Sequence, residues 1–233
     1  MLPWFASAAD RDVFDAMRDN ERLASGGGWI TGHHDARWDF RGTGPDRTLA
    51  AHADTGSGWQ VLMTSHVQQF TLNYGEKFKQ WLGDLSKVTD KNKGLVGFGP
   101  GPVLGPGHPL IIVRHPSRSD DSRTLIAAAL PEAGIVHNKG YVHAVAVEPG
   151  TEENAVLALL GFLNTPIADW WARRFVDRHV TAPVVNQMAL PEWTPDQVET
   201  AASYTGSLLA RRGYNRLAGG VVVADGHPST SDG

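Results

Sequence analysis

Residues 110–131 read LIIVRHPSRSDDSRTLIAAALP and contain two apolar runs separated by a polar segment. The first run, residues 110–114, is short and rich in β-branched side chains, which predicts a strand. The second run, residues 124–130, predicts another buried element, which Pro131 ends. Residues 141–147 (YVHAVAV) show the alternation that is typical of a strand. We expect these three segments to form a central sheet.

Helical patterns lie on both sides of these strands in the sequence. Residues 151–163 begin with Thr151, which can cap a helix, and continue with two acids that favour its N-terminus. Residues 155–163 are apolar nearly all round, so we expect this helix to be buried against the sheet. Further helices are expected over residues 7–23, 167–176 and 194–212, with cap signals at Ser7 and Thr194.

The remaining segments carry weaker patterns. Short strands are expected at residues 60–64 and 135–136, a short helix within residues 74–93, and extended chain at residues 183–190. Residues 94–109 contain six glycines and four prolines, which excludes regular structure. The whole pattern predicts an α+β fold, in which helices cover a mostly antiparallel or mixed central sheet with long irregular loops. We expect one domain over residues 1–215 and a disordered tail over residues 216–233.

Composition and charge exclude several classes of protein. The chain has 233 residues, a formal net charge of −4 and no cysteine. A polybasic nucleic-acid binder needs the opposite net charge. The lack of cysteine excludes disulfides, thiol catalysis and cysteine-bound metals. No apolar run approaches the roughly 20 residues that span a bilayer, and the N-terminus turns acidic too soon for a signal peptide. We therefore expect a cytoplasmic protein with no membrane partner.

No segment matches a catalytic or cofactor-binding motif with the spacing that its chemistry needs. His33, His34 and Asp35 are the densest group of possible metal ligands, but no HExxH or HxH spacing accompanies them. The glycines of residues 97–101 lie among prolines that exclude the helix a phosphate loop requires. Residues 164–167 (NTPI) resemble only part of the Asn-Pro-Pro-Tyr motif of amino-methyltransferases and indicate a helix break. We expect no catalytic group, metal or cofactor in this chain.

Side chains that can bind DNA are scattered along the sequence instead. Arginine, glutamine and asparagine can form bidentate hydrogen bonds with base edges, and basic side chains bind phosphates. The candidate DNA-binding residues are His66, Gln68, Gln69, Asn73, Arg114, Arg118, Arg123, Lys139, Arg173 and Arg174. An arginine close to an aspartate is more often a structural ion pair, so internal pairing is the alternative for those near Asp120 and Asp121.

Residues 113–131 resemble the motif R-x-x-x-R-S-x-[DN]-x-R-T-x-I-A-A-x-x-P. This motif occurs in the C-terminal target-recognition region of large adenine-specific DNA methyltransferases. These are the TaqI-like and type IIG restriction–modification enzymes and the PglX-like methyltransferases of phage-defence systems. Residues 63–74, 155–164 and 184–191 resemble the segments that surround the motif in these enzymes. The sequence departs from the family at His115-Pro116 and contains no counterpart of the methyltransferase domain.

The resemblance implies a sequence-specific DNA recognition module of a restriction–modification or phage-defence system. Its partners would be double-stranded DNA and a separate methyltransferase or restriction subunit, and S-adenosylmethionine would bind to that subunit. Within the motif, we expect Thr124, Ile126 and Ala128 to be structural. Arg118 and Arg123 are expected either to hold the adjacent loop or to contact phosphate.

Two alternatives remain open from the sequence. The chain could be an autonomous enzyme whose site lies around His33, His34, Asp35 and Asp39. It could also be a truncated remnant without function. A stoichiometric metal would favour the first alternative, and a cooperative thermal melt would argue against the second.

Overall fold

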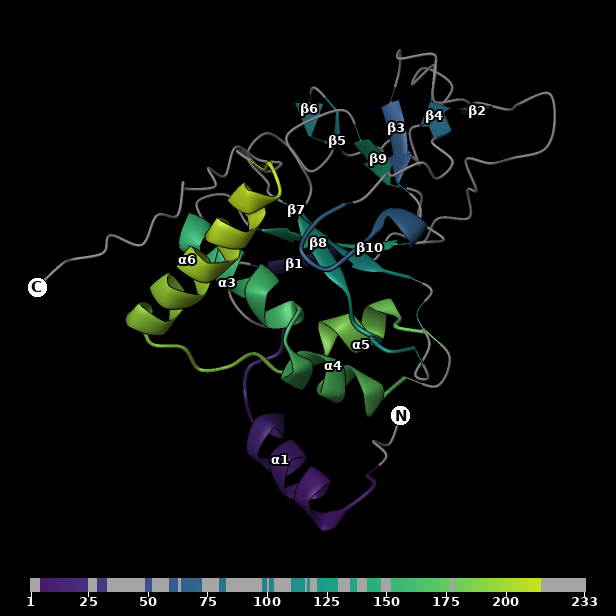
Figure 1. The fold of residues 1–233 in the computed structure, drawn as a ribbon. Helices are drawn as coiled ribbons and strands as arrows, with labels where there is room; N and C mark the ends of the chain where they lie inside the picture. Colours follow the sequence, from purple (N-terminus) through teal and green to yellow (C-terminus); the bar gives the residue numbers. More distant parts are fainter. Residues whose placement is uncertain are drawn as a thin grey trace, which may run out of the picture.

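A computed structural model shows the fold (Figure 1). It describes residues 5–24, 29–32, 49–51, 59–62, 64–72, 80–82, 98–99, 101–102, 110–115, 117, 121–129, 135–137, 142–147, 152–176 and 179–214. Within this part of the chain, helices and two sheets are combined, and the protein has the α+β fold that the sequence predicts. The elements are labelled as in Figure 1.

The two apolar runs of residues 110–131 form neighbouring strands of a four-stranded sheet. The order of this sheet is β1 (Trp29–Gly32), β10 (Val142–Val147), β7 (Leu110–Arg114) and β8 (Ala127–Ala129). All its pairs are antiparallel, and Ile112 of β7 lies opposite Ala144 on one side and Ala128 on the other. All three alanines of β8 are fully buried, so both faces of this strand are covered. The expected central sheet is therefore confirmed.

Helices bury their apolar faces against this sheet and against each other. α3 (Glu153–Leu163) packs on β8 and along α6 (Pro195–Arg211), as Figure 1 shows. Seven of its residues are buried, as expected for a helix that is apolar nearly all round. α4 (Pro166–Arg173) follows after a bend of 61°. No described helix is by itself long and apolar enough to cross a membrane.

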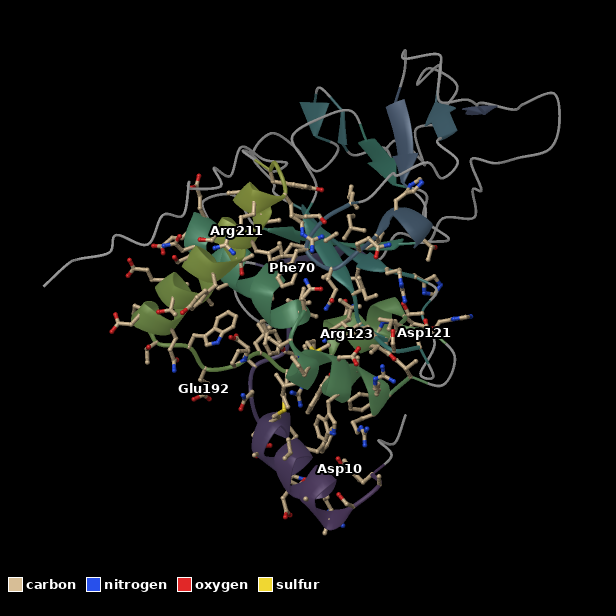
Figure 2. All side chains as sticks on the ribbon, in the orientation of Figure 1. Asp10, Phe70, Asp121, Arg123, Glu192 and Arg211 are labelled. Atoms are coloured by element: carbon tan, nitrogen blue, oxygen red, sulfur yellow. The ribbon has the colours of Figure 1, made fainter. Side chains whose placement is uncertain are left out.

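α1 (Ala8–Arg18) lies beyond α4, at the end of the molecule that the Asp10 label marks in Figure 2. Its N-cap is Ser7, whose hydroxyl accepts a hydrogen bond from the N–H of Asp10, as the sequence predicts. None of its residues is fully buried. The helix contacts the core through Phe14, whose ring stacks on Trp171 of α4 with ring centres 4.7 Å apart.

Short strands build a second, six-stranded sheet. Their order is β2 (Leu49–Ala51), β4 (Gln80–Leu82), β3 (Trp59–Leu62), β9 (Ile135–His137), β5 (Phe98–Gly99) and β6 (Gly101–Pro102). Only β3 and β9 pair in parallel; the other pairs are antiparallel. A 3-10 turn, η1 (Thr64–His66), follows β3. The strands expected at residues 60–64 and 135–136 are thus present within one or two residues.

Four local predictions were wrong. Residues 74–93 contain the strand β4 where a helix was expected, and residues 94–109 contain the two-residue strands β5 and β6 where no regular structure was expected. Residues 183–190 were expected to be extended, but they begin in the helix α5 (Ala182–Asn186). Pro183 is tolerated there because the first helical turn needs no N–H partner. The N-cap position of α3 is Glu152 rather than Thr151. The Glu152 side chain makes no hydrogen bond to the first helical turn.

Candidate nucleic-acid interface

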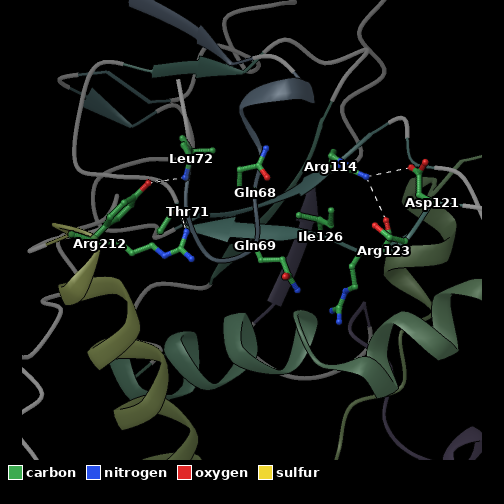
Figure 3. Close-up of a pocket in the computed structure, with 11 residues that line it drawn as sticks. Gln68, Gln69, Thr71, Leu72, Arg114, Asp121, Arg123, Ile126 and Arg212 are labelled. Carbon is green, nitrogen blue, oxygen red and sulfur yellow. Dashed lines mark hydrogen bonds and ion pairs between the residues drawn. The ribbon is translucent and has the colours of Figure 1, made fainter. Parts of the chain in front are cut away.

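A polar groove of about 730 Å³ opens beside β8 (Figure 3). It is lined by residues that follow η1, by residues between β7 and β8, and by the C-terminal end of α6. Four of the candidate DNA-binding residues line it: Gln68, Gln69, Arg114 and Arg123. The other lining residues are Thr71, Leu72, Asp121, Ser122, Ile126, Arg212 and Tyr214. The groove therefore gathers amides, hydroxyls and guanidinium groups from segments up to 146 positions apart in the sequence.

The two glutamines lie on a tight turn over residues 67–72. Val67 and Leu72 form an isolated antiparallel bridge, and the N–H of Gln68 donates to the carbonyl of Thr71 at 3.0 Å. Phe70 adopts φ = 69°, in the left-handed region that a bulky side chain rarely occupies. Such a conformation costs about 1–3 kcal/mol and persists only where its surroundings hold it. Phe70 is not itself a lining residue of the groove, but its neighbours Gln69 and Thr71 both are.

The central sheet holds one side of this turn. The N–H of Phe70 donates to the carbonyl of Ala127 at 2.8 Å, and the N–H of Ala129 donates to the carbonyl of Phe70 at 2.9 Å. Phe70 is thus added to the edge of β8 through a parallel bridge with Ala128. The A-A-A segment of the family-like motif therefore fixes the backbone of the glutamine turn.

The end of α6 holds the other side. The N–H of Leu72 donates to the hydroxyl oxygen of Tyr214 at 2.8 Å, and Arg212 Nη1 donates to Thr71 Oγ1 at 3.3 Å. Burial raises the pKa of the Tyr214 hydroxyl, although the N–H of Leu72 and the charge of Arg212 lower it. The hydroxyl therefore stays neutral at physiological pH. Contacts across about 140 positions of sequence thus fix the turn from both sides.

Arg114 holds the polar segment of the motif against β7. Its Nε donates to Ser117 Oγ at 3.1 Å, and its Nη2 lies 3.3 Å from Asp121 Oδ2 and 3.4 Å from the carbonyl of Arg123. Its side chain is only 20% exposed. Arg114 thus fixes the loop and leaves Asp121 at the rim of the groove (Figure 3).

Arg123 caps the C-terminal end of α3. Its Nη2 donates to the carbonyls of Asn164 and Thr165, at 2.6 and 3.2 Å. A cation is favourable there because the helix dipole leaves partial negative charge on these carbonyls. The Nε atom of Arg123 is buried and has no hydrogen-bond partner among the described residues. Of the two roles expected for Arg123, the structure shows the one that holds the loop.

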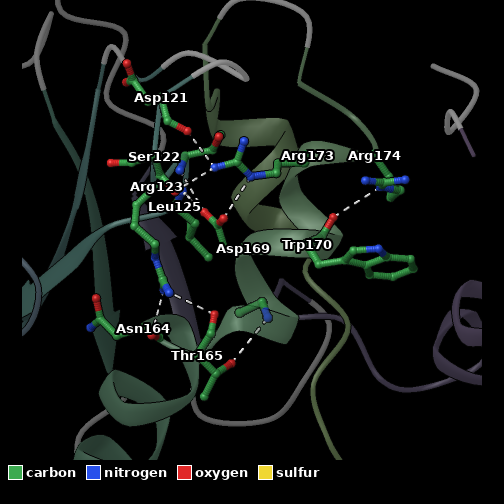
Figure 4. A network of polar contacts seen from close by, with 12 residues as sticks. Asp121, Ser122, Arg123, Leu125, Asn164, Thr165, Asp169, Trp170, Arg173 and Arg174 are labelled. Atoms are coloured by element: carbon green, nitrogen blue, oxygen red, sulfur yellow. Dashed lines mark hydrogen bonds and ion pairs between the residues drawn. The ribbon is translucent and has the colours of Figure 1, made fainter. Parts of the chain in front are cut away.

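Asp169 anchors the same segment from below (Figure 4). Its Oδ1 accepts hydrogen bonds from the N–H groups of Thr124 and Leu125, at 2.7 and 2.6 Å. Its Oδ2 pairs with Arg173 Nε at 2.8 Å, and Arg173 Nη2 also donates to the carbonyl of Asp121 at 2.7 Å. Asp169 is only 7% exposed. The buried carboxylate therefore orders the backbone that carries Arg123.

The groove is positive. Three arginines line it, with one aspartate that is paired to Arg114. Arg123 and Arg212 have no carboxylate partner within the described segments, because both donate only to neutral oxygens there. Their charges act in a concave surface, where low-dielectric walls concentrate the potential. This local patch differs in sign from the chain as a whole, whose net charge is −4.

The other candidate residues lie elsewhere. His66 is fully buried in η1, and Arg173 lies behind the groove on Asp169. Arg174 is 3.8 Å from Asp10 Oδ2, and its guanidinium group lies over the Trp170 ring at 4.9 Å. Outside the described residues are Asn73, Arg118 and Lys139, and also His33, His34, Asp35 and Asp39. The described part of the chain contains no group of three or more histidine, aspartate or glutamate side chains that could hold a metal.

The groove residues that were not predicted as site residues include Thr71, Arg212 and Tyr214. The sequence places Arg212 at the end of a helix, but its pattern gives no sign that this end reaches residues 67–72. The contacts depend on how α6 packs along α3. That packing is close, since a Cβ atom added to Gly161 of α3 would lie 2.6 Å from Thr205 Oγ1 of α6.

Comparison with known proteins adds no assignment to this site. No protein-family model and no curated protein matches the chain. The groove is therefore defined by its own geometry: a strained glutamine turn, three arginines, and a helix end that fixes the turn.

Proposed function

We propose that this chain is a sequence-specific DNA recognition module of an adenine-N6 methyltransferase from a restriction–modification or phage-defence system. A separate catalytic subunit would bind S-adenosylmethionine and carry out the transfer. The observation that supports this proposal best is the groove, which brings Gln68 and Gln69 together with three arginines on a rigid framework. The likeness of residues 113–131 to a target-recognition motif gives the direction of the proposal.

The chemistry of the groove suits a duplex. Glutamine can hydrogen-bond adenine through both amide atoms, and arginine can bind guanine edges or phosphates. The glutamines lie on a turn at the edge of the sheet, and the arginines lie to either side of it (Figure 3). In sequence-specific DNA recognition, base contacts read the sequence and phosphate contacts fix the position of the protein on the duplex.

The arginines of the motif support this function indirectly. Arg114 holds the loop by a hydrogen bond to the buried Ser117 hydroxyl. Arg123 holds it by a hydrogen bond to a backbone carbonyl at the end of α3. Recognition groups need such support, because a site displaced by about 1 Å loses much of its specificity. The motif therefore acts as scaffold, and the turn and the exposed Arg212 are the contact residues.

A net charge of −4 limits the affinity of the chain alone for DNA. We expect weak binding by the isolated protein and tighter binding together with its catalytic subunit, which would supply further phosphate contacts. This division also fits the target base, which the catalytic subunit must extrude from the duplex at a cost of a few kcal/mol.

The test is an electrophoretic mobility shift with random duplexes, with and without a methyltransferase subunit encoded next to the chain. The proposal predicts that the pair binds and methylates duplex DNA, and that methylation is lost without the chain. It is refuted if the pair neither binds nor methylates DNA. It is also refuted if the isolated chain turns over S-adenosylmethionine or cleaves DNA, since the chain would then be an enzyme.

A further inference from the structure

We infer that Gln69 recognises an adenine in the major groove of the bound duplex. This inference rests on the proposed function and adds to it a residue and a base. It depends on three features of Gln69: the state of its amide group, the rigidity of its backbone, and the groups that share its side of the groove.

The amide of Gln69 is not used within the described structure. The side chain lines the groove and is only partly exposed. Its amide group makes no hydrogen bond with any described residue. Gln197 is different, because its amide oxygen accepts a hydrogen bond from the N–H of Thr194 at 3.0 Å and completes a helix cap. Gln69 therefore presents both a donor and an acceptor to whatever enters the groove.

The backbone that carries Gln69 is fixed on both sides. The preceding residue is hydrogen-bonded across the turn to Thr71, and the following residue, Phe70, is bonded to β8 by its N–H and by its carbonyl. The strained φ of Phe70 shows that these contacts outweigh the local preference of the chain. A side chain on such a backbone loses little conformational freedom when it binds, and this favours specific recognition.

The donor and acceptor of an amide match one base edge in the major groove. Adenine offers an acceptor at N7 and a donor at N6, which an amide can pair with simultaneously. Guanine offers two acceptors, N7 and O6, and would leave the amide oxygen facing a carbonyl. Arg123, whose guanidinium group is held by the carbonyls at the end of α3, adds positive charge near the same part of the groove (Figure 3). The amide therefore selects adenine, and the guanidinium charge attracts the strand that carries it.

The test is selection from a random duplex pool by the full chain together with its methyltransferase subunit, followed by sequencing. We expect the wild-type pair to enrich a motif in which one adenine is fixed. Gln69→Ala is expected to weaken the preference at that position by about 5- to 150-fold and to leave the other positions unchanged. Gln69→Glu, which can only accept, is expected to shift the preference there toward cytosine, whose N4 donates.

The control is Gln187→Ala, which removes an exposed glutamine outside the groove and is expected to leave the motif unchanged. If the wild-type pair enriches a motif that Gln69→Ala and Gln69→Glu both leave intact, the inference is wrong and the proposed function stands. If the wild-type pair enriches no motif, the proposed function itself fails. Thermal melts of all three variants establish that each is folded.

Discussion

Asp169→Asn is the sharpest test of how the groove is held. The substitution keeps the size of the side chain and removes its charge. In the protein, one carboxylate oxygen accepts from the N–H groups of Thr124 and Leu125, and the other pairs with Arg173 at 2.8 Å. An amide has only one oxygen. If that oxygen keeps the two backbone donors, the NH₂ group of the new asparagine faces the guanidinium group, donor against donor.

The size of the effect follows from these three bonds. Losing the bond to Arg173 removes about 1.5–3 kcal/mol, the contribution of a hydrogen bond to a charged group. The two backbone bonds change from charge-assisted to neutral, which roughly halves each of them. Breaking a buried ion pair by removing one partner typically lowers the free energy of unfolding by about 3–5 kcal/mol. Because the Arg173 side chain is 24% exposed, we expect a loss near the lower limit, about 3 kcal/mol.

The assay is urea unfolding followed by circular dichroism, with the midpoint and slope fitted together. Asp12→Asn is the matched control, because Asp12 is exposed on α1; it is expected to change the free energy of unfolding by less than about 0.5 kcal/mol. A loss below about 1 kcal/mol for Asp169→Asn would refute the reasoning. It would mean that the Asp169 network does not hold the segment that carries Arg123.

Three further substitutions test other parts of the fold. Gly161→Ala is expected to lower the free energy of unfolding by about 1–2 kcal/mol, because the new Cβ would lie 2.6 Å from Thr205 Oγ1. Adding Thr205→Ala should restore most of the lost stability. A double variant no more stable than Gly161→Ala alone would contradict this explanation. Thr194→Ala removes the hydroxyl that caps α6 at the N–H of Gln197 and should lower stability by about 1 kcal/mol, measured by urea unfolding. Burial lowers the pKa of His115, so the unfolded chain takes up a proton first as the pH falls below about 6.5, and stability should fall with it. His115→Asn should reduce this pH dependence of the unfolding midpoint, and equal slopes for both proteins would show that another group causes it.

Long apolar patterns in the sequence predicted the centre of the fold correctly. Residues 110–114 and 142–147 form paired strands, and residues 155–163 lie in the helix that covers the sheet. Residues 111–113 and 156–160 are buried, and apolar runs of this kind indicate buried positions in the sequence. In the second sheet, only β3 and β9 were expected, since its strands have two to four residues and show no periodicity.

The proline of α5 shows a different limit. Residues 183–190 contain Pro183 followed by two valines, a composition that favours extended chain. In the protein, Pro183 occupies the first turn of a five-residue helix, and Val184 and Val185 are both buried. Tertiary packing therefore overrides a local preference of less than about 1 kcal/mol per residue.

The candidate site was predicted in part, for a physical reason. Gln68 and Gln69 were identified by the chemistry of their side chains, which needs no knowledge of the fold. Arg173 was identified in the same way, yet it lies on Asp169, because a nearby carboxylate in space decides the partner of an arginine. Arg212 and Tyr214 reach the groove only through the packing of α6 along α3. No pattern in the sequence around Arg212 and Tyr214 indicates that contact.

The salt dependence of binding tests most directly whether this groove contacts duplex DNA. The equilibrium constant for duplex binding by the chain with its catalytic subunit would be measured over a range of salt concentrations. The wild-type protein is compared with Arg212→Ala, inside the groove, and with Arg211→Ala, its exposed neighbour outside the groove. We predict that Arg212→Ala lowers the magnitude of the log–log slope by about 1 and that Arg211→Ala leaves it unchanged. Equal slopes for all three proteins would contradict such contact.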